Sequence, residues 1–180
     1  MTDREIISLY KKGRREEAFN AIVDCYSERL YWHVRRFMYS HDDTHDVMQE
    51  IFIKIWKNLD TFRAESQLFT WIYRIATNEA IYHIRSRKNY TFVQSESTDQ
   101  FLGRIIDDDP HFNGNEIQRE MHKAIQKLPE KQRIVFCMRY FDEMKYEDIS
   151  EITETSVGAL KASYHHAYNK VRTEIESILL

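Results

Sequence analysis

The chain has 180 residues, of which 31% are charged, and its formal net charge at pH 7 is −3. Four glycines and two prolines leave little material for the many tight turns of an all-β protein, so the composition predicts an all-α fold. The length suits two small helical domains, and the net charge excludes a uniformly basic nucleic-acid binder.

The two cysteines, Cys25 and Cys137, are isolated within apolar helical patterns, with no second cysteine at metal or redox spacing. We expect buried, reduced thiols, because free cysteine packs like a small hydrophobic residue. The N-terminus has no apolar signal core, and no apolar run is long enough to span a membrane. The sequence therefore predicts a cytoplasmic location and no membrane insertion.

The N-terminal half reads as a series of helices. A short helix breaks at Gly13, and a longer one from about Glu16 to Met38 carries apolar residues at spacings of three and four. The next helix runs to about Leu59, and Ser40, Asp42 or Asp43 can cap its start. Residues 60–68 form a polar connector, and the following helix extends to about Lys88.

The C-terminal half begins after a segment without sustained periodicity. Residues 91–114 are rich in acids and contain Pro and Gly, so we expect a flexible acidic linker between a domain at 1–90 and a domain at 115–180. Four helices follow, in the segments "NEIQREMHKAIQKL", "EKQRIVFCMRYFD", "KYEDISEI" and "SVGALKASYHHAYNKVRTEIESILL". Pro129 separates the first two of these.

Charge divides the chain into basic and acidic stretches. Residues 62–90 contain five basic and two acidic side chains, and residues 156–172 contain three basic side chains and no acid. Residues 96–120 contain seven acidic and two basic side chains. Basic segments suit phosphate contacts, so the pattern indicates two nucleic-acid surfaces on either side of an acidic linker.

The helix from Phe69 to Lys88 has two developed faces. At about 100° per residue, one face gathers apolar residues sufficient for a core. The opposite face mixes aromatic rings, an amide and guanidinium groups, which can stack on unpaired bases, read base edges and hold phosphates. The alternative is a helix buried on both sides. The apolar face comprises Phe69, Ile72, Tyr73, Ala76, Ala80 and Ile84, and the opposite face comprises Trp71, Arg74, Asn78, Ile81, Tyr82 and Arg85.

Residues 146–172 form a helix-turn-helix candidate, with Thr155 or Ser156 as the cap of the second helix. A free helix N-terminus suits docking against phosphate, and the side chains of its first turns can reach base edges in the major groove. An ordinary helical hairpin is the alternative. Small or basic residues on one side permit close approach to a duplex, namely Ala159, Lys161, Ala162 and Ser163, whereas Val157, Leu160, Tyr164, Ala167 and Val171 form an inward stripe.

Two motif blocks together resemble a known family. The segments "DVMQEIFIKIWKN" and "FRAESQLFTWIYRIATNEA" resemble region 2 of bacterial sigma factors. The segment "LPEKQRIVFCMRYFDEMKYEDISEITETSVGALKASYHHAYNKV" resembles their region 4. With only these regions and a linker, the chain resembles an extracytoplasmic-function (ECF) sigma factor of the sigma-70 superfamily.

The resemblance implies a function and partners. Such proteins direct bacterial RNA polymerase core to promoters and help to open them, without catalytic activity or cofactors. Region 2 binds the β′ clamp helices and the minus-10 element, region 4 reads the minus-35 element beside the β flap, and the linker passes near the active-site channel. An anti-sigma factor, often membrane-anchored, commonly restrains them.

The resemblance also implies site residues in this chain. The polymerase contacts are Asp46, Gln49 and Glu50. The minus-10 contacts are Phe62, Arg63, Leu68, Phe69, Trp71, Arg74, Asn78 and Arg85. The minus-35 contacts are Ser156, Ala159, Lys161, Ser163 and His166. Here the sequence departs from the family: Ser163, His166 and Tyr168 stand where arginines are usual, Ala159 replaces a threonine and Glu154 replaces the glycine of the turn.

Two rival functions are compatible with parts of the sequence. A helix-turn-helix regulator independent of polymerase would bury Trp71 and Asn78 and bind duplex tightly by itself. A metal-dependent nuclease would use His41 and His45, which are four residues apart beside acidic residues. These histidines lie at a predicted helix start, where acids are favourable in any case, so we expect no metal site.

Overall fold

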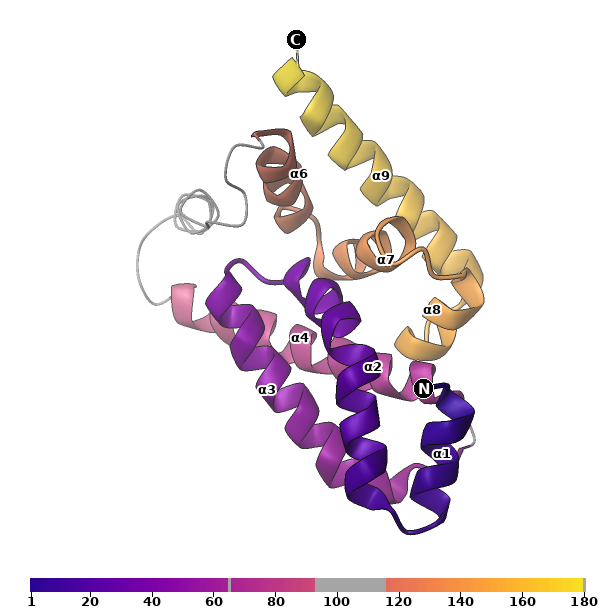
Figure 1. Ribbon diagram of the computed structural model, residues 1–180. Coiled ribbons are helices and arrows are strands. Elements are labelled where there is room, and N and C mark those ends of the chain that lie inside the picture. The colour runs from indigo at the N-terminus through magenta and orange to yellow at the C-terminus, as the bar shows by residue number, and fades with distance from the viewer. Residues whose placement is uncertain (65, 93–115, 180) are drawn as a thin grey trace.

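The computed structural model describes residues 1–64, 66–92 and 116–179, and the side chains of residues 87–92, 178 and 179 lie outside the description. All regular elements of this part are helices, which confirms the predicted fold class (Figure 1). The predicted linker at 91–114 lies almost wholly outside the described residues. None of the described helices is long and apolar enough to cross a membrane.

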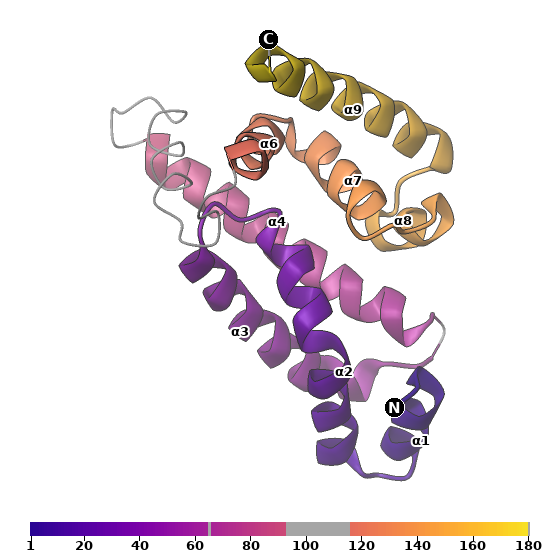
Figure 2. The same ribbon diagram turned by 45° about the horizontal axis from the view of Figure 1, so that its top comes forward.

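The N-terminal half is a bundle of helices around one apolar core (Figures 1 and 2). Helix α1 spans Asp3–Lys11, α2 spans Arg15–Arg35, α3 spans His41–Asn58 and α4 spans Leu68–Phe92, with a short 3₁₀ helix at Leu59–Thr61. Packing of α2, α3 and α4 against one another buries side chains such as Ile22, Leu30, Ile51, Ile55 and Ile72.

Local chemistry explains where these helices begin. Thr2 and Glu5 form a capping box at α1, in which each side chain bonds to the other residue's backbone N–H. Gly13 has φ of 76°, a left-handed conformation that glycine adopts without steric penalty, and it turns the chain from α1 to α2. Ser40 caps α3 by accepting a hydrogen bond from the backbone N–H of Asp43, which confirms one of the three predicted caps.

Two helix ends differ from the sequence prediction. Helix α2 ends at Arg35 rather than near Met38, because a turn directs Phe37 and Met38 into the core, where both side chains are fully buried. Helix α4 continues to Phe92 rather than ending near Lys88. No glycine or proline lies between these positions to stop it.

The C-terminal half is a second helical unit. Helix α6 spans Glu116–Gln126, α7 spans Glu130–Tyr140, α8 spans Tyr146–Thr153 and α9 spans Val157–Leu179. Helix α9 packs across α6, α7 and α8 and closes a core. The inward stripe predicted for α9 is confirmed by Leu160, Ala167 and Val171, which are buried.

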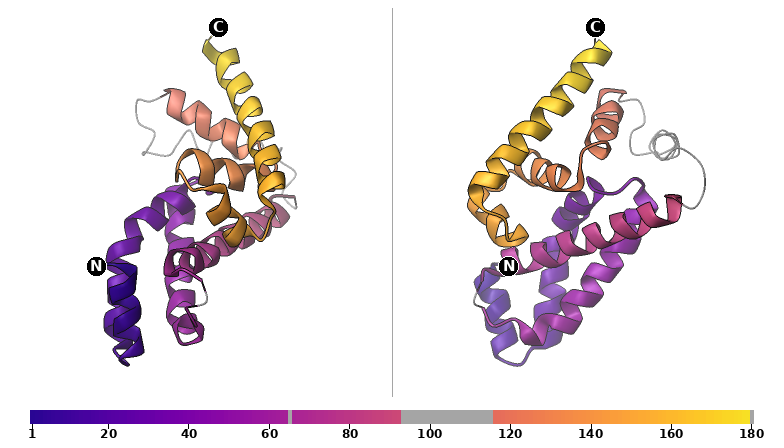
Figure 3. Two further views of the ribbon diagram at one scale, coloured as in Figure 1. Left: turned by 90° about the vertical axis from the view of Figure 1, so that its right-hand side faces the viewer. Right: turned by 180° about the vertical axis from the view of Figure 1, so that it is seen from behind.

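The two halves pack against each other. Helix α8 contacts α4, and the views from the side and from behind show the C-terminal unit lying over α4 and one end of α2 (Figure 3). The side chain of Asp142, in the turn between α7 and α8, reaches His33 and Arg36 of α2. This contact joins residues 109 positions apart in the chain.

Candidate nucleic-acid interface

Helix α4 has the two faces that its sequence predicted. Ile72, Tyr73, Ala76, Ala80 and Ile84 are buried in the core of the N-terminal half, and Phe69 packs against it in a half-buried position. Burial raises the pKa of the Tyr73 hydroxyl to about 12, as expected for a phenol enclosed in the core. The inward face is therefore fully used by packing.

The opposite side of α4, which we call the α4 outer face, comprises Arg74, Asn78, Ile81, Tyr82 and Arg85. Tyr82 is 67% exposed, and Asn78 and Arg85 are also exposed. The alternative prediction of a helix buried on both sides is wrong for Asn78, Tyr82 and Arg85, whereas Arg74 and Ile81 are half-buried. Asn78 and Tyr82 can be reached from solvent without disturbing the core, whereas Arg74 and Arg85 contact residues of the C-terminal half.

Trp71 occupies an intermediate position at the start of α4. Its indole is half-buried and packs against the Phe62 ring, with ring centroids 5.1 Å apart and planes tilted by 45°. Tilted aromatic pairs of this kind are stabilising, and the contact fixes the indole while leaving part of it in solvent. Trp71 is thus held in place but not enclosed.

The connector before α4 differs from the prediction at two positions. Leu68 is 1% exposed and Phe62 is 8% exposed, so both side chains belong to the core. They were predicted to touch DNA, but their burial leaves no surface for a base. Arg63 is exposed as predicted, and Ala64 adopts a positive φ of 58° that turns the loop.

Helices α8 and α9 form the predicted helix-turn-helix. Ser156 caps α9 by accepting a hydrogen bond from the backbone N–H of Ala159 at 3.4 Å, whereas the Thr155 hydroxyl donates to the carbonyl of Thr153. Glu154 ends α8 in the left-handed conformation, with φ of 53° and ψ of 36°. The turn therefore keeps the geometry that favours glycine, although a glutamate occupies it.

The outer side of α9 presents the residues predicted to read duplex DNA. Ser156, Ala159, Lys161 and His166 are exposed, and Ser163 is half-buried at the edge of a cavity. The Lys161 ammonium lies 5.7 Å from the centroid of the Tyr146 ring, a contact that can steady the side chain. The exposed N-terminus of α9 has the form that docks into a major groove.

The predicted polymerase contacts share the surface of α3. Asp46, Gln49 and Glu50 are all exposed, and no described side chain is bonded to them. Near the start of this helix, Nε2 of His41 lies 2.8 Å from Nε2 of His45, and the Tyr31 hydroxyl bonds Nδ1 of His41. Among the residues the structure describes, no group of three or more His, Cys, Asp or Glu side chains is arranged to hold a metal ion.

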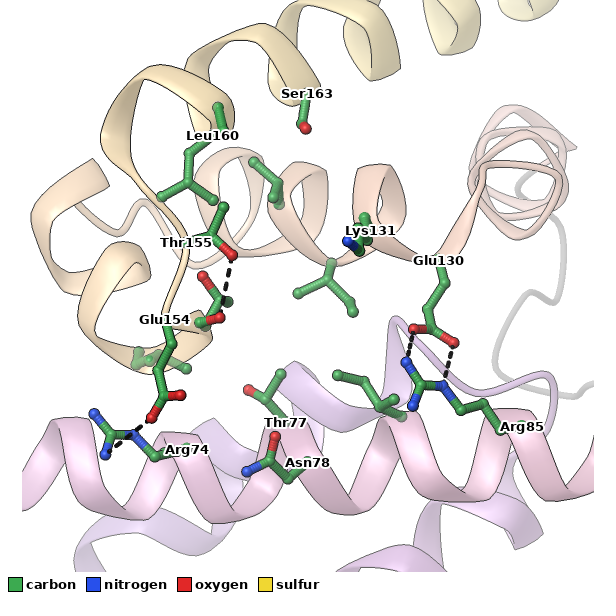
Figure 4. A pocket seen from close by; sticks show the side chains of 16 residues that line it. Arg74, Thr77, Asn78, Arg85, Glu130, Lys131, Glu154, Thr155, Leu160 and Ser163 are labelled. Atoms are coloured by element: carbon green, nitrogen blue, oxygen red, sulfur yellow. Dashed lines mark hydrogen bonds and ion pairs between the residues drawn. The ribbon is translucent and has the colours of Figure 1, made fainter.

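A cavity of about 380 Å³ separates the α4 outer face from the C-terminal half (Figure 4). Arg74, Asn78 and Arg85 line one wall, and residues of α7, α8 and the start of α9 line the other. Each of the two arginines contacts a residue of the C-terminal half on the opposite wall. Arg85 binds both carboxylate oxygens of Glu130, at 2.7 and 3.0 Å, and Arg74 donates to the carbonyl of Glu151 at 2.6 Å.

The contacts between the two halves were not predicted from the sequence. Arg85 and Glu130 are 45 residues apart, and His33 and Asp142 are 109 residues apart. No local spacing brings such pairs together. The sequence offered one hint of these contacts. Glu130 at the start of α7 and Asp142 just after its end are acidic residues to which no role had been assigned.

The sequence and the structure both match sigma factors. The sequence models described as Sigma-70 region 2 and Sigma-70, region 4 match residues 22–90 and 118–171. The chain is 30% identical to the ECF RNA polymerase sigma factor SigW of Bacillus subtilis, with 99% of each chain covered. It is 29% identical to the RNA polymerase sigma-H factor of Pseudomonas aeruginosa, over 98% of this chain and 95% of that protein.

Solved structures agree on the fold. The sigma factor RpoE of Bartonella quintana, in complex with the anti-sigma factor NepR, matches with a TM-score of 0.67 at 21% identity, over 88% of this chain and 96% of that chain. CnrH in complex with the cytosolic domain of CnrY matches with a TM-score of 0.69 at 21% identity and 97% coverage of both chains. Taken with the paired region 2 and region 4 matches, the chain belongs to the extracytoplasmic-function branch of the sigma-70 family of RNA polymerase sigma factors.

Proposed function

We propose that this sigma factor directs bacterial RNA polymerase core to specific promoters and helps to open them, without a catalytic reaction or a cofactor of its own. The observation that carries the proposal is the α4 outer face. It presents an amide and two guanidinium groups beside a held indole, in the same chain as a helix-turn-helix with an exposed recognition helix.

In this proposal, the energy for opening the promoter duplex comes only from binding of the separated strand to the protein. Unpairing and flipping a base costs a few kcal/mol, and stacking each base on an aromatic side chain returns about 1–3 kcal/mol. Trp71 is placed to form the upstream stacking platform, Asn78 to read a base edge, and Arg63, Arg74 and Arg85 to hold phosphates. Phe69, half-buried at the entrance to α4, completes this proposed minus-10 set.

Region 4 is proposed to read duplex DNA through Ser156, Ala159, Lys161, Ser163 and His166. Of these, only Lys161 carries a permanent positive charge, so few phosphates are neutralised. Because the salt dependence of DNA binding scales with the number of neutralised phosphates, we expect weak binding by the free protein and a shallow salt dependence. Polymerase then has to supply most of the affinity for the promoter.

The proposed partners are the RNA polymerase core and an anti-sigma factor. The exposed residues Asp46, Gln49 and Glu50 on α3 are assigned to the β′ clamp helices, and region 4 is assigned to the β flap. An anti-sigma factor of the kind present in the solved relatives is a further partner, and the cytoplasm is the proposed location. The domain bounds that we propose are 1–90 for region 2 and 115–180 for region 4.

Transcription in vitro tests the proposal. Purified core polymerase is mixed with the protein and a pool of promoter fragments, and the RNA start sites are sequenced. We expect starts at a shared upstream sequence pattern only when the protein is present. An absence of protein-dependent starts would refute the proposal, and tight, specific duplex binding without polymerase would instead favour the independent regulator.

A further inference from the structure

The arginines of the α4 outer face are occupied by region 4 of the same chain. Arg85 makes a two-pronged contact with the Glu130 carboxylate at the start of α7 (Figure 4). Arg74 bonds the carbonyl of Glu151 and lies 3.8 Å from the Glu154 carboxylate in the turn before α9. Two of the three arginines proposed to hold promoter phosphates, Arg74 and Arg85, therefore already face oxygen ligands.

Carboxylate and phosphate compete for the same guanidinium geometry. The planar fork of arginine binds two oxygens of either group through parallel N–H···O bonds. Glu130 therefore occupies on Arg85 the position that a phosphate would take. Asn78 is exposed but faces the cavity between the halves, so a strand that approaches α4 also meets α7 and α8.

A buried anchor holds region 4 in this position. Asp142, whose side chain is 9% exposed, accepts a hydrogen bond from Nδ1 of the fully buried His33 at 2.6 Å and bonds to Arg36. Nε2 of His33 lies 3.2 Å from the Thr77 hydroxyl of α4. The Arg36 guanidinium also lies over the Phe141 ring, 4.7 Å from its centroid.

A second contact lies beside the anchor. The Met38 carbonyl accepts hydrogen bonds from Nε2 of His122 at 3.0 Å and from the Gln126 amide at 3.4 Å. Gln126 also donates to the carbonyl of Arg36 at 3.1 Å. These bonds join α6 to the end of α2, and His122 and Gln126 are almost fully buried. Region 4 is thus attached along one side of region 2.

We propose that region 4 acts as a built-in competitive cover for the minus-10 surface of region 2, an inference that rests on the function proposed above. Glu130 and Glu154 hold the arginines that promoter phosphates need, and the Asp142 anchor keeps the cover closed. Only the protein molecules in which region 4 has moved away from region 2 can then bind single-stranded DNA. The apparent affinity of the free protein falls in proportion to the fraction of such molecules. Separation of the two halves exposes the site.

Two double variants of the full chain test the cover. Glu130→Gln with Glu154→Gln removes both competing carboxylates. Glu147→Gln with Glu151→Gln is the matched control, since it removes the same charge from exposed side chains, and Glu151 contacts Arg74 only through its backbone carbonyl. Each pair also contains one acid from the first turn of a helix, Glu130 in α7 and Glu147 in α8.

The probe is a fluorescein-labelled 12-nucleotide single-stranded DNA pool with all four bases at every position, followed by anisotropy. We expect the Glu130/Glu154 variant to bind about threefold to tenfold more tightly than wild type, because exposed ion pairs have modest strength. The control should stay within about twofold of wild type. Equal tightening by both double variants would overturn the cover.

Small-angle scattering of Asp142→Ala checks the anchor. We expect a larger radius of gyration than wild type with unchanged helix content in circular dichroism. A folded variant of unchanged radius would overturn the anchor, and if the variant loses helix, the scattering of the Glu130/Glu154 variant decides instead. A refutation of the cover is distinguishable from a refutation of the proposed sigma-factor function. The second is measured separately, by promoter-dependent transcription starts with core polymerase.

Discussion

The glutamate at the turn of the helix-turn-helix allows a quantitative test of backbone strain. Glu154 has φ of 53° and Glu143, in the turn between α7 and α8, has φ of 52°. A left-handed conformation costs a non-glycine residue about 1–2 kcal/mol. Glycine removes this cost but adds about 0.4–1 kcal/mol of unfolded-state freedom. We therefore expect Glu143→Gly to raise the free energy of unfolding by about 0.5–1 kcal/mol.

Glu154→Gly differs from Glu143→Gly by one interaction. The Glu154 carboxylate lies 3.8 Å from Arg74, and the side chains are 79% and 39% exposed. Such an exposed pair contributes roughly 0.2–1 kcal/mol by comparison with measured surface pairs. Glu154→Gly should therefore stabilise the fold by slightly less than Glu143→Gly at low salt. Both variants remove one negative charge, so each serves as the other's control.

Urea unfolding followed by circular dichroism at 222 nm measures both effects, because urea leaves the ionic strength unchanged. At 1 M salt, where the Debye length is about 3 Å, the two variants should reach equal stability. Thermal midpoints should rise by about 1–4 °C, given about 2–4 °C per kcal/mol for a chain of this size. If Glu143→Gly lowers stability at both salt concentrations, the strain argument is refuted.

The remaining predictions concern a buried thiol and the proposed contacts. Burial raises the pKa of the Cys137 thiol to about 12 from an ordinary 9.0, so iodoacetamide at pH 8 should leave it unmodified in the folded protein while the less buried Cys25 reacts, as read by mass spectrometry. The stability gained from the neutral thiol is complete below pH 9 and is lost as the pH rises toward 12. Trp71→Ala should slow open-complex formation about tenfold or more while polymerase binding is retained, and Trp71→Phe should restore most of the rate. Lys161→Ala should reduce the salt slope of promoter binding by about 1. Gln49→Ala should lower affinity for core polymerase without changing helix content.

Each of these predictions has an outcome that would contradict it. Rapid alkylation of native Cys137 would show that the thiol is not enclosed. Equal loss of polymerase binding and opening in a folded Trp71→Ala protein would exclude a stacking role. Lys170→Ala, farther along α9, is the control for Lys161→Ala, and equal effects would exclude a specific contact. Asn20→Ala serves the same purpose for Gln49→Ala, since Asn20 is exposed on α2.

Much of the fold was predictable because helices are determined by local chemistry. The spacing of apolar residues predicted the buried faces of α4 and α9, and Ser40 and Ser156 cap their helices as the sequence indicated. The resemblance placed Glu154 at the position of the family's turn glycine, and the residue there adopts the left-handed conformation that glycine favours. These features depend on residues only a few positions apart.

The connector before α4 was predicted less well. Phe62 and Leu68 were assigned to DNA because of their place in the family motif, but their side chains are buried. A polar segment gives no periodic signal that would tell which of its few apolar residues turn inward. That choice depends on the space left between α3 and α4, and this space exists only once the helices have packed.

The sequence by itself determined the helices, their buried faces, the order of the two regions and hence the family. Only the tertiary structure decided that region 4 lies over the α4 outer face and that Glu130 and Asp142 meet Arg85 and His33. The physical reason is range. Helix periodicity and capping act over a few residues, whereas a carboxylate can pair with any accessible cation, and only the packed chain brings one particular cation to it.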